Sequence, residues 1–203
     1  MKKLLLVGAV ALFAVMNAQD NETVGFNKGN TFITGAIGYA TQTQGEFKNS
    51  NFTIAPSVGY FATPNIALGT RIGFSNTTES VKIANLKLED KSNLFTAGLF
   101  GRYYWMPASR FSIFAELNAN YATQKFTEDN ASLPDTEYKL NGFSVGFAPG
   151  ISYFISNHFA LEASVGVFNY MNLKEDEDGA ESVEDSNIGI NLNDISFGLI
   201  YKF

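Results

Sequence analysis

Hydrophobic and polar residues alternate with a period of two in eight segments of the chain. This alternation places successive side chains on opposite faces of a β-strand. Each segment is about as long as the roughly 9–11 tilted residues with which a strand crosses a bilayer. The segments lie near residues 31–41, 51–61, 66–75, 94–105, 111–122, 142–154, 159–170 and 191–203.

The two faces of these segments differ in a consistent way. In the second segment Phe52, Ile54, Val58 and Tyr60 share one face, and most of the residues between them are small or polar. An apolar face turned outwards and a polar face turned inwards is typical of a membrane barrel and the reverse of a soluble one. The pattern therefore predicts an all-β fold, an eight-stranded antiparallel up-and-down transmembrane β-barrel.

The connections between the segments alternate in length. Short turns and long loops on opposite sides are typical of the periplasmic and extracellular ends of such a barrel. We therefore expect both termini to be periplasmic and the long loops to be extracellular. The short turns are Ala62–Asn65, Met106–Ser109 and Ile155–His158, and the longer stretches lie near 42–50, 76–93, 123–141 and 171–190.

The N-terminus has the three-part layout of a secretory signal peptide. Lys2 and Lys3 precede an apolar run from Leu4 to Val15, and small or polar residues follow at 17–19, where we place cleavage after Ala18. We predict a signal peptide over 1–18 and an outer-membrane barrel domain over 19–203. No second apolar stretch approaches the roughly 20 residues of a membrane helix, so a membrane-spanning remainder must be β.

Composition agrees with a wall of strands more than with a catalytic centre. The chain has 19 Phe, nine Tyr and 18 Gly but one His and no Cys. Its formal charge of −6 would become −8 without Lys2 and Lys3, which argues against a nucleic-acid partner. No cofactor, metal cluster or nucleophile–base pair is indicated. The single His158 lies in a short turn, and we expect a protein that is not an enzyme.

Four charged residues fall on the face predicted to point inwards. They are Arg71, Arg102, Glu116 and Glu162, each four to seven residues beyond a short turn. At comparable depth they can pair and, with neighbouring phenylalanines, fill a lumen that is only wide enough for side chains. The alternative is a gated path for ions or protons, because charges inside membranes are often functional.

The chain also contains an internal repeat and an acidic stretch. Residues 55–74 and 148–167 repeat at an offset of 93, and each copy contains a proline, Pro56 or Pro149, which predicts a bulge or bend. The acidic stretch 174–185 matches a calcium loop only in part, since Lys174 occupies the first ligand position. We expect a solvated outer loop, and divalent bridging to lipopolysaccharide stays open.

The C-terminal strand carries a resemblance to a known family. Phe197, Leu199, Tyr201 and Phe203 share its apolar face, and only Ile200 departs from the alternation. With the signal peptide, the eight strands and the loop asymmetry, the chain resembles the OmpA/OmpX-type family of outer-membrane β-barrels, in its compact form without a periplasmic domain.

The resemblance implies a place in the outer membrane of a Gram-negative bacterium and assembly by the outer-membrane insertion machinery. It implies contact with outer-membrane lipids and lipopolysaccharide, and a structural, adhesive or surface-interaction role. The alternative function is a narrow porin-like channel or a transporter of small hydrophobic molecules. The oligomeric state stays open. The residues implied as the insertion signal are Ser196, Gly198, Tyr201 and Phe203.

Overall fold

The computed structural model describes residues 24–83, 86–128, 136–175, 182–189 and 195–203. The predicted signal peptide, 1–18, and the start of the predicted barrel domain lie outside these ranges. Within them no helix is long and apolar enough to cross a membrane. The regular elements are strands: β1 Thr31–Gln44, β2 Phe47–Phe61, β3 Ile66–Ile83, β4 Leu86–Trp105, β5 Phe111–Glu128, β6 Thr136–Phe154, β7 Phe159–Val165, β8 Phe168–Glu175, β9 Ser182–Ile188 and β10 Ile195–Lys202.

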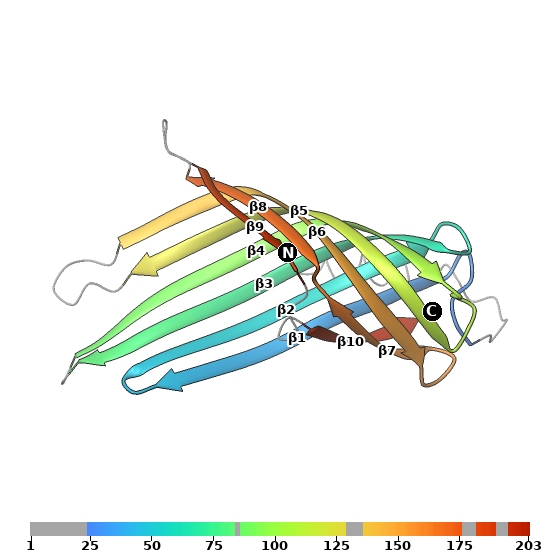
Figure 1. The fold of residues 1–203 in the computed structure, drawn as a ribbon, viewed down its shortest axis with the longest axis horizontal. Coiled ribbons are helices and arrows are strands. Elements are labelled where there is room, and N and C mark those ends of the chain that lie inside the picture. Colours follow the sequence, from blue (N-terminus) through green and yellow to red (C-terminus); the bar gives the residue numbers. More distant parts are fainter. Residues whose placement is uncertain (1–23, 84–85, 129–135, 176–181, 190–194) are drawn as a thin grey trace, which may run out of the picture.

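These strands fill eight positions in one antiparallel wall (Figure 1). Strands β1 to β6 pair in sequence order, and β7 and β8 pair with successive halves of β6, so together they occupy one position. In the next position β9 pairs with β8 and β10 pairs with β7. The ladder between β10 and β1, from Phe32↔Lys202 to Ala36↔Gly198, closes the barrel. The predicted eight-stranded antiparallel barrel is confirmed.

The two ends of the barrel differ. Turns 62–65, 106–110 and 155–158 join strands at one end, which we call the short-turn end. The β1–β2, β3–β4, β5–β6 and β8–β9 connections lie at the other, which we call the hairpin end. Above Ala36, towards the hairpin end, the described part of β1 pairs with β2 alone.

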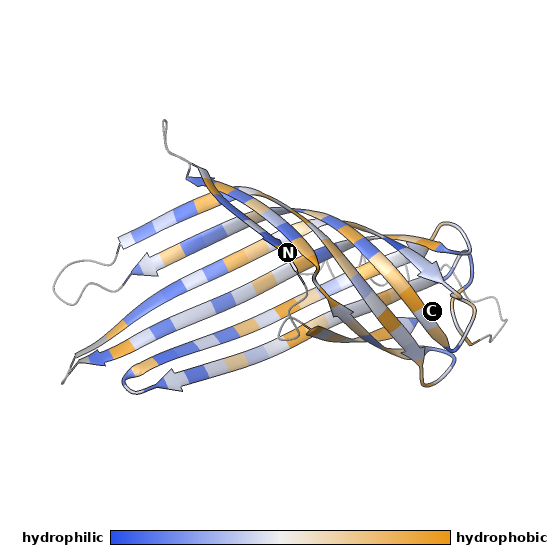
Figure 2. Cartoon of the chain, viewed as in Figure 1, coloured by the Kyte–Doolittle hydropathy of each residue, from blue (hydrophilic) through white to orange (hydrophobic). Residues whose placement is uncertain are grey.

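The strands run further than their hydrophobic pattern predicts. Most of the described residues in the stretches expected as long loops belong to paired strands, and the β1–β2 connection shrinks to Gly45 and Glu46, with Gly45 at φ 61°. The long loops were a wrong prediction. The apolar outward face ends there, and several of the apolar residues that remain, such as Phe126, Leu140 and Leu173, lie on the inward face, yet the backbone ladder continues. Figure 2 shows this as strands that turn more hydrophilic towards the hairpin end.

The two repeated prolines behave differently. The β2–β3 register is the same on both sides of Pro56, where Ile54 pairs with Phe74 and Ser57 with Arg71, so no bulge forms. Beside Pro149, Gly150 pairs with Ser164 but Phe147 pairs with Phe168. Three steps on β6 therefore face four on its neighbour, which is a one-residue bulge. Of the bulge or bend predicted at both prolines, a bulge occurs beside Pro149 only, on the facing strand.

Candidate functional site

Four strands bring the inward-facing charges into one cluster, the ion-pair layer of Arg71, Arg102, Glu116 and Glu162. Arg71, from β3, donates from Nη1 and Nη2 to the two carboxylate oxygens of Glu116, at 2.8 and 2.9 Å. Its Nε donates to Ser57 Oγ at 2.9 Å. The structure thus places all four predicted residues together, because each lies on the inward face of its strand.

Arg102 is the centre of the ion-pair layer. Its Nε donates to Glu116 Oε2 at 2.7 Å, and its Nη1 and Nη2 donate to the Glu162 carboxylate at 2.6 and 3.1 Å. The side chain is 2% exposed, and its guanidinium lies 4.5 Å from the centre of the Phe114 ring. Each buried charge has an opposite partner, which offsets the desolvation that would otherwise exclude it from the barrel interior.

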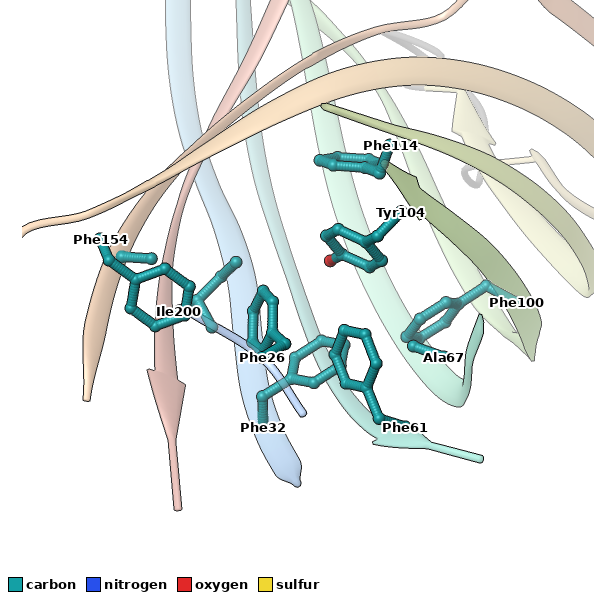
Figure 3. Packing of buried hydrophobic residues seen from close by; sticks show 10 residues of the cluster. Phe26, Phe32, Phe61, Ala67, Phe100, Tyr104, Phe114, Phe154 and Ile200 are labelled. Atoms are coloured by element: carbon teal, nitrogen blue, oxygen red, sulfur yellow. The ribbon is translucent and has the colours of Figure 1, made fainter. Parts of the chain in front are cut away.

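An aromatic cluster fills the lumen between the ion-pair layer and the short-turn end (Figure 3). The sequence predicts phenylalanines such as Phe100 and Phe114 in the lumen beside the charges, and both are buried in this cluster; the further aromatics at inward positions were not expected on a face described as small, Gly-rich or polar. Several of these aromatics lie at inward positions beside a turn. There, alternation alone does not distinguish an aromatic that fills the lumen from one that faces the membrane interface. We call the cluster the aromatic plug. Its larger members are Phe26, Phe32, Phe61, Phe100, Tyr104, Phe114, Phe154 and Ile200.

Phe26 belongs to the aromatic plug although it is not part of any strand of the barrel wall. It precedes β1, is fully buried, and its ring centre lies 4.6 Å from that of Phe61 and 4.8 Å from that of Phe154. Its backbone N–H donates to Pro107 O at 2.7 Å, and Lys202 Nζ donates to Gly25 O at 2.8 Å. The N-terminal segment therefore acts as a stopper in the short-turn mouth. No periodic pattern in the sequence predicts it.

Glycines make room for the plug. Phe32, Phe100 and Phe114 each lie opposite a glycine on a neighbouring strand, at Gly59, Gly69 and Gly150. A Cβ on any of these glycines would come within 2.2–2.3 Å of a ring carbon of its partner. The pairing of a ring with a cross-strand glycine fills the gap that the glycine leaves in a strand. It accounts for part of the high content of both residue types.

Beyond the ion-pair layer, towards the hairpin end, lies a cavity of about 350 Å³. Its lining is mixed, with Thr53, Asn118, Ser164 and Ser196 among its polar residues. Asn118 links the cavity to the ion-pair layer, since its Nδ2 lies 3.4 Å from Glu116 Oε1. The charged and aromatic layers form the floor of this space.

The residues of the implied insertion signal divide between the two faces of β10. Ser196 and Gly198 line the lumen cavity. Tyr201 and Phe203 pack edge to face with ring centres 4.9 Å apart. Ile200, the residue outside the alternation, is fully buried in the aromatic plug. The departure from the pattern is thus explained by the packing of the lumen.

Neither His158 nor the described part of the acidic stretch forms a metal or acid–base centre. His158 Nδ1 lies 2.9 Å from Lys202 O, in the turn between β6 and β7. Across the described ranges no three His, Cys, Asp or Glu side chains gather as metal ligands. Lys174 pairs with Ser182 in the β8–β9 ladder. Residues 176–181, with most of the partial calcium-loop match, lie outside the described residues.

The outer face carries an apolar band between two rows of aromatic residues. Row members on one strand are eight to ten residues apart, as Tyr60 and Phe52 or Phe111 and Tyr121 show. That separation fits the apolar band of a transmembrane barrel, about 25 Å tall. The row nearer the hairpin end, the hairpin-side aromatic row, consists of Tyr39, Phe52, Phe74, Phe95, Tyr121, Phe143 and Tyr170.

A closed wall, a greasy outer band and a lumen filled by side chains define a small transmembrane β-barrel. The chain belongs to the outer membrane β-barrel family, since the model described as the outer membrane protein beta-barrel domain matches residues 5–203. This membership places the protein in the outer membrane. No curated protein is significantly similar to it in sequence.

Solved structures of other outer membrane proteins share the fold, among them the following two. The outer membrane protein OprG from Pseudomonas aeruginosa is 20% identical, with 91% of this chain and 99% of that chain covered and a TM-score of 0.59. A major outer membrane protein from Thermus thermophilus is 12% identical, with 86% and 99% covered and a TM-score of 0.51. At these identities the likeness concerns the fold alone.

Proposed function

We propose that this protein is a non-conducting barrel with a structural, adhesive or surface-interaction role at its hairpin end. The observation that carries the proposal is the double closure of the lumen. The ion-pair layer crosses from β3 to β7, and the aromatic plug with Phe26 fills the space below it. A pore would have to displace both layers. We therefore expect the function to depend on the surface of the hairpin end rather than on the lumen.

The hairpins support a role at the cell surface. β3 and β4 pair without a break from Ile66↔Tyr103 to Ile83↔Leu86, far beyond the hairpin-side aromatic row. Paired strands present side chains on a stiffer frame than an irregular loop does. We infer that the hairpin end is extracellular and that both described chain ends face the periplasm, in keeping with short turns on the periplasmic side.

Single cysteines test this orientation, because the chain contains none. Ser80→Cys lies near the hairpin end and Ser156→Cys lies in a short turn. A membrane-impermeant maleimide applied to intact cells should label the first variant alone, and detergent lysis should expose the second. Labelling of Ser156→Cys on intact cells would reverse the orientation.

The surface role is tested by shortening one hairpin. Replacing residues 77–92 by an Asn-Gly turn removes the outer part of the β3–β4 hairpin and keeps Arg71 and Arg102 of the ion-pair layer. Cells with this variant should adhere less to polystyrene and to immobilised fibronectin than cells with equal amounts of the unchanged protein. As a matched control, Ser109→Gly alters a short turn at the other end. Unchanged adherence on both surfaces would refute this role for the hairpin.

A second candidate is the binding of a small apolar molecule in the hairpin half of the lumen. It is favoured by a separate apolar cluster above the ion-pair layer, made of Ala122, Leu140 and Leu173 with Leu94, Phe126 and Met171 beside it. The fluorescence of 1-N-phenylnaphthylamine should then rise with the folded protein and fall for Leu140→Asn. Equal fluorescence with both proteins would remove this candidate.

We infer that the protein is not an enzyme. Its single histidine is held by the carbonyl of Lys202 at the short-turn end, and no nucleophile–base arrangement surrounds it in the described chain. His158→Gln should therefore leave assembly and adherence unchanged in the assays above.

A further inference from the structure

The seam between β1 and β10, which closes the barrel, is short. It holds five residue pairs, from Phe32↔Lys202 to Ala36↔Gly198, whereas β1 and β2 share fourteen. Beyond Ala36 the described part of β1 pairs with β2 alone. Proteins open first where few contacts hold an element in place. We therefore expect the wall to open at this seam before it opens at the longer ladders.

The N-terminal segment, residues 24–30, binds the barrel on both sides of the seam. On the β10 side, Lys202 Nζ donates to Gly25 O at 2.8 Å. On the β1–β2 side, the Gly29 N–H donates to Phe61 O at 2.9 Å. The segment thus ties the last strand of the wall to the hairpin formed by the first two.

Phe26 occupies a site that exists only in the closed barrel. Between β6 and β1 the wall contains β7 and β10, so side chains of β6 and β1 reach one common ring only when the seam is closed. Phe26 is fully buried and contacts both strands, as well as β2 and β4 (Figure 3). The four rings around it, with centres 4.6–5.4 Å from its own, are Phe32, Phe61, Tyr104 and Phe154.

Gly25 fits the N-terminal segment against the turn between β4 and β5. Its φ of 95° lies in the left-handed region, which glycine adopts freely. A Cβ at this position would come within 2.5–2.8 Å of backbone atoms of Pro107 and Ala108. Backbone atoms of a turn cannot move aside as the end of a flexible side chain can. Alanine at position 25 would therefore displace the segment without changing any side chain of the barrel wall.

We propose that the N-terminal segment is a strap that docks after the barrel has closed and then holds the β1–β10 seam shut. Contacts that form after the transition state of folding slow unfolding and leave the folding rate unchanged. The segment therefore sets how slowly the folded barrel reopens, a step that exposes unpaired backbone groups to lipid. This role requires neither an extracellular hairpin end nor a function at the cell surface.

The folding and unfolding rates of the full-length protein in lipid vesicles test the order of these events. Urea jumps start both reactions, and heat-dependent mobility on gels follows them. Gly25→Ala should raise the unfolding rate by roughly tenfold or more, because overpacking against backbone is costly, and should change the folding rate less than about twofold. Lys28→Ala, an exposed residue of the same segment, is the control and should change neither rate.

Two results of these measurements would overturn the proposal. An unfolding rate of Gly25→Ala equal to that of Lys28→Ala would show that the segment does not hold the barrel closed. A folding rate that falls as much as the unfolding rate rises would show that the segment docks before closure.

Hydrogen exchange of the folded protein tests where the wall opens. Mass spectrometry of peptides compares the seam with the β3–β4 ladder, which runs from Ile66↔Tyr103 to Ile83↔Leu86. In Gly25→Ala the amides of residues 32–36 and 198–202 should exchange at least about fivefold faster, and those of β3 and β4 less than about twofold faster. Equal acceleration in both regions would show that the segment only fills the lumen, which also overturns the proposal.

A milder variant keeps the test decisive if Gly25→Ala gives no barrel that shifts on unboiled gels. Phe26→Leu retains an apolar side chain in the aromatic plug and loses part of the ring contacts to β1 and β6. It should show the same pattern, with faster unfolding, an unchanged folding rate and faster exchange at the seam. Faster exchange throughout the wall, or slower folding, would count against the strap in this variant as well.

Discussion

Glu116→Leu removes the carboxylate that joins the two arginines of the ion-pair layer. In the folded protein this carboxylate accepts hydrogen bonds from Arg71 Nη1 and Nη2 at 2.8 and 2.9 Å and from Arg102 Nε at 2.7 Å. Leucine cannot accept any of them. Arg71 then keeps Ser57 as a hydrogen-bond partner, and Arg102 keeps Glu162.

The size of the effect follows from what stays paired. Removal of one partner from a buried ion pair costs about 3–5 kcal/mol, because it leaves an uncompensated charge. The side chain of Arg71 is 24% exposed to the lumen cavity, and Arg102 retains its second carboxylate. We therefore expect a loss near the lower end, about 3 kcal/mol. Adding Arg71→Leu should recover part of it, since no lone cation remains on β3.

The assay is urea unfolding of the protein in lipid vesicles, followed by the emission of Trp105. This is the one tryptophan of the chain, and it lies on the outer face near the short-turn end. Heat-dependent mobility on gels gives a second readout. Glu128→Leu is the control, since Glu128 is an exposed residue at the end of β5. Equal unfolding midpoints for Glu116→Leu and Glu128→Leu would refute the stabilising role of the ion-pair layer.

Three further changes follow from the packing of the lumen and of the last strand. Gly59→Ala forces a Cβ towards the Phe32 ring and should lower the free energy of unfolding by about 1–3 kcal/mol. Gly38→Ala, with open space around it, should change it little. Equal urea midpoints for the two variants would contradict the glycine–ring pairing. Phe26→Ala empties the centre of the aromatic plug and should cost about 3 kcal/mol, while the exposed Lys28→Ala should be neutral; a stable Phe26→Ala protein would show that the N-terminal stopper is dispensable. Deletion of Phe203 should lower the amount of barrel assembled in cells more than its refolding in vesicles, and assembly at the full level would argue against the implied insertion signal.

The sequence predicts the barrel well because its evidence is local. Alternation with a period of two assigns a face to each residue of a strand, and so Arg71, Arg102, Glu116 and Glu162 could be oriented without any knowledge of their neighbours. The register then brings them to one level, as the pairing of Arg102 with Glu116 across β4 and β5 shows. The alternation within single strands was sufficient to predict that these four residues face the lumen.

Other features depend on contacts that no local pattern contains. Phe26 lies in a segment without period, and its place is fixed by Pro107, Lys202 and four rings of the barrel wall. The extent of β3 and β4 depends on a backbone ladder between residues that are polar on both faces. Ile200 breaks the alternation of β10 because its side chain packs into the aromatic plug. The plug is assembled from residues of several other strands, and it needs an apolar residue at this position.

The most direct test of the central claim is single-channel recording of the folded full-length protein in planar bilayers. Samples whose mobility on gels changes with boiling should be used, so that the barrel is known to be closed. The recording should show a baseline without discrete steps in molar potassium chloride, because two layers of side chains fill the lumen. Steps of constant amplitude that vanish when the same sample is boiled would contradict it and show that the ion-pair layer lines an open path.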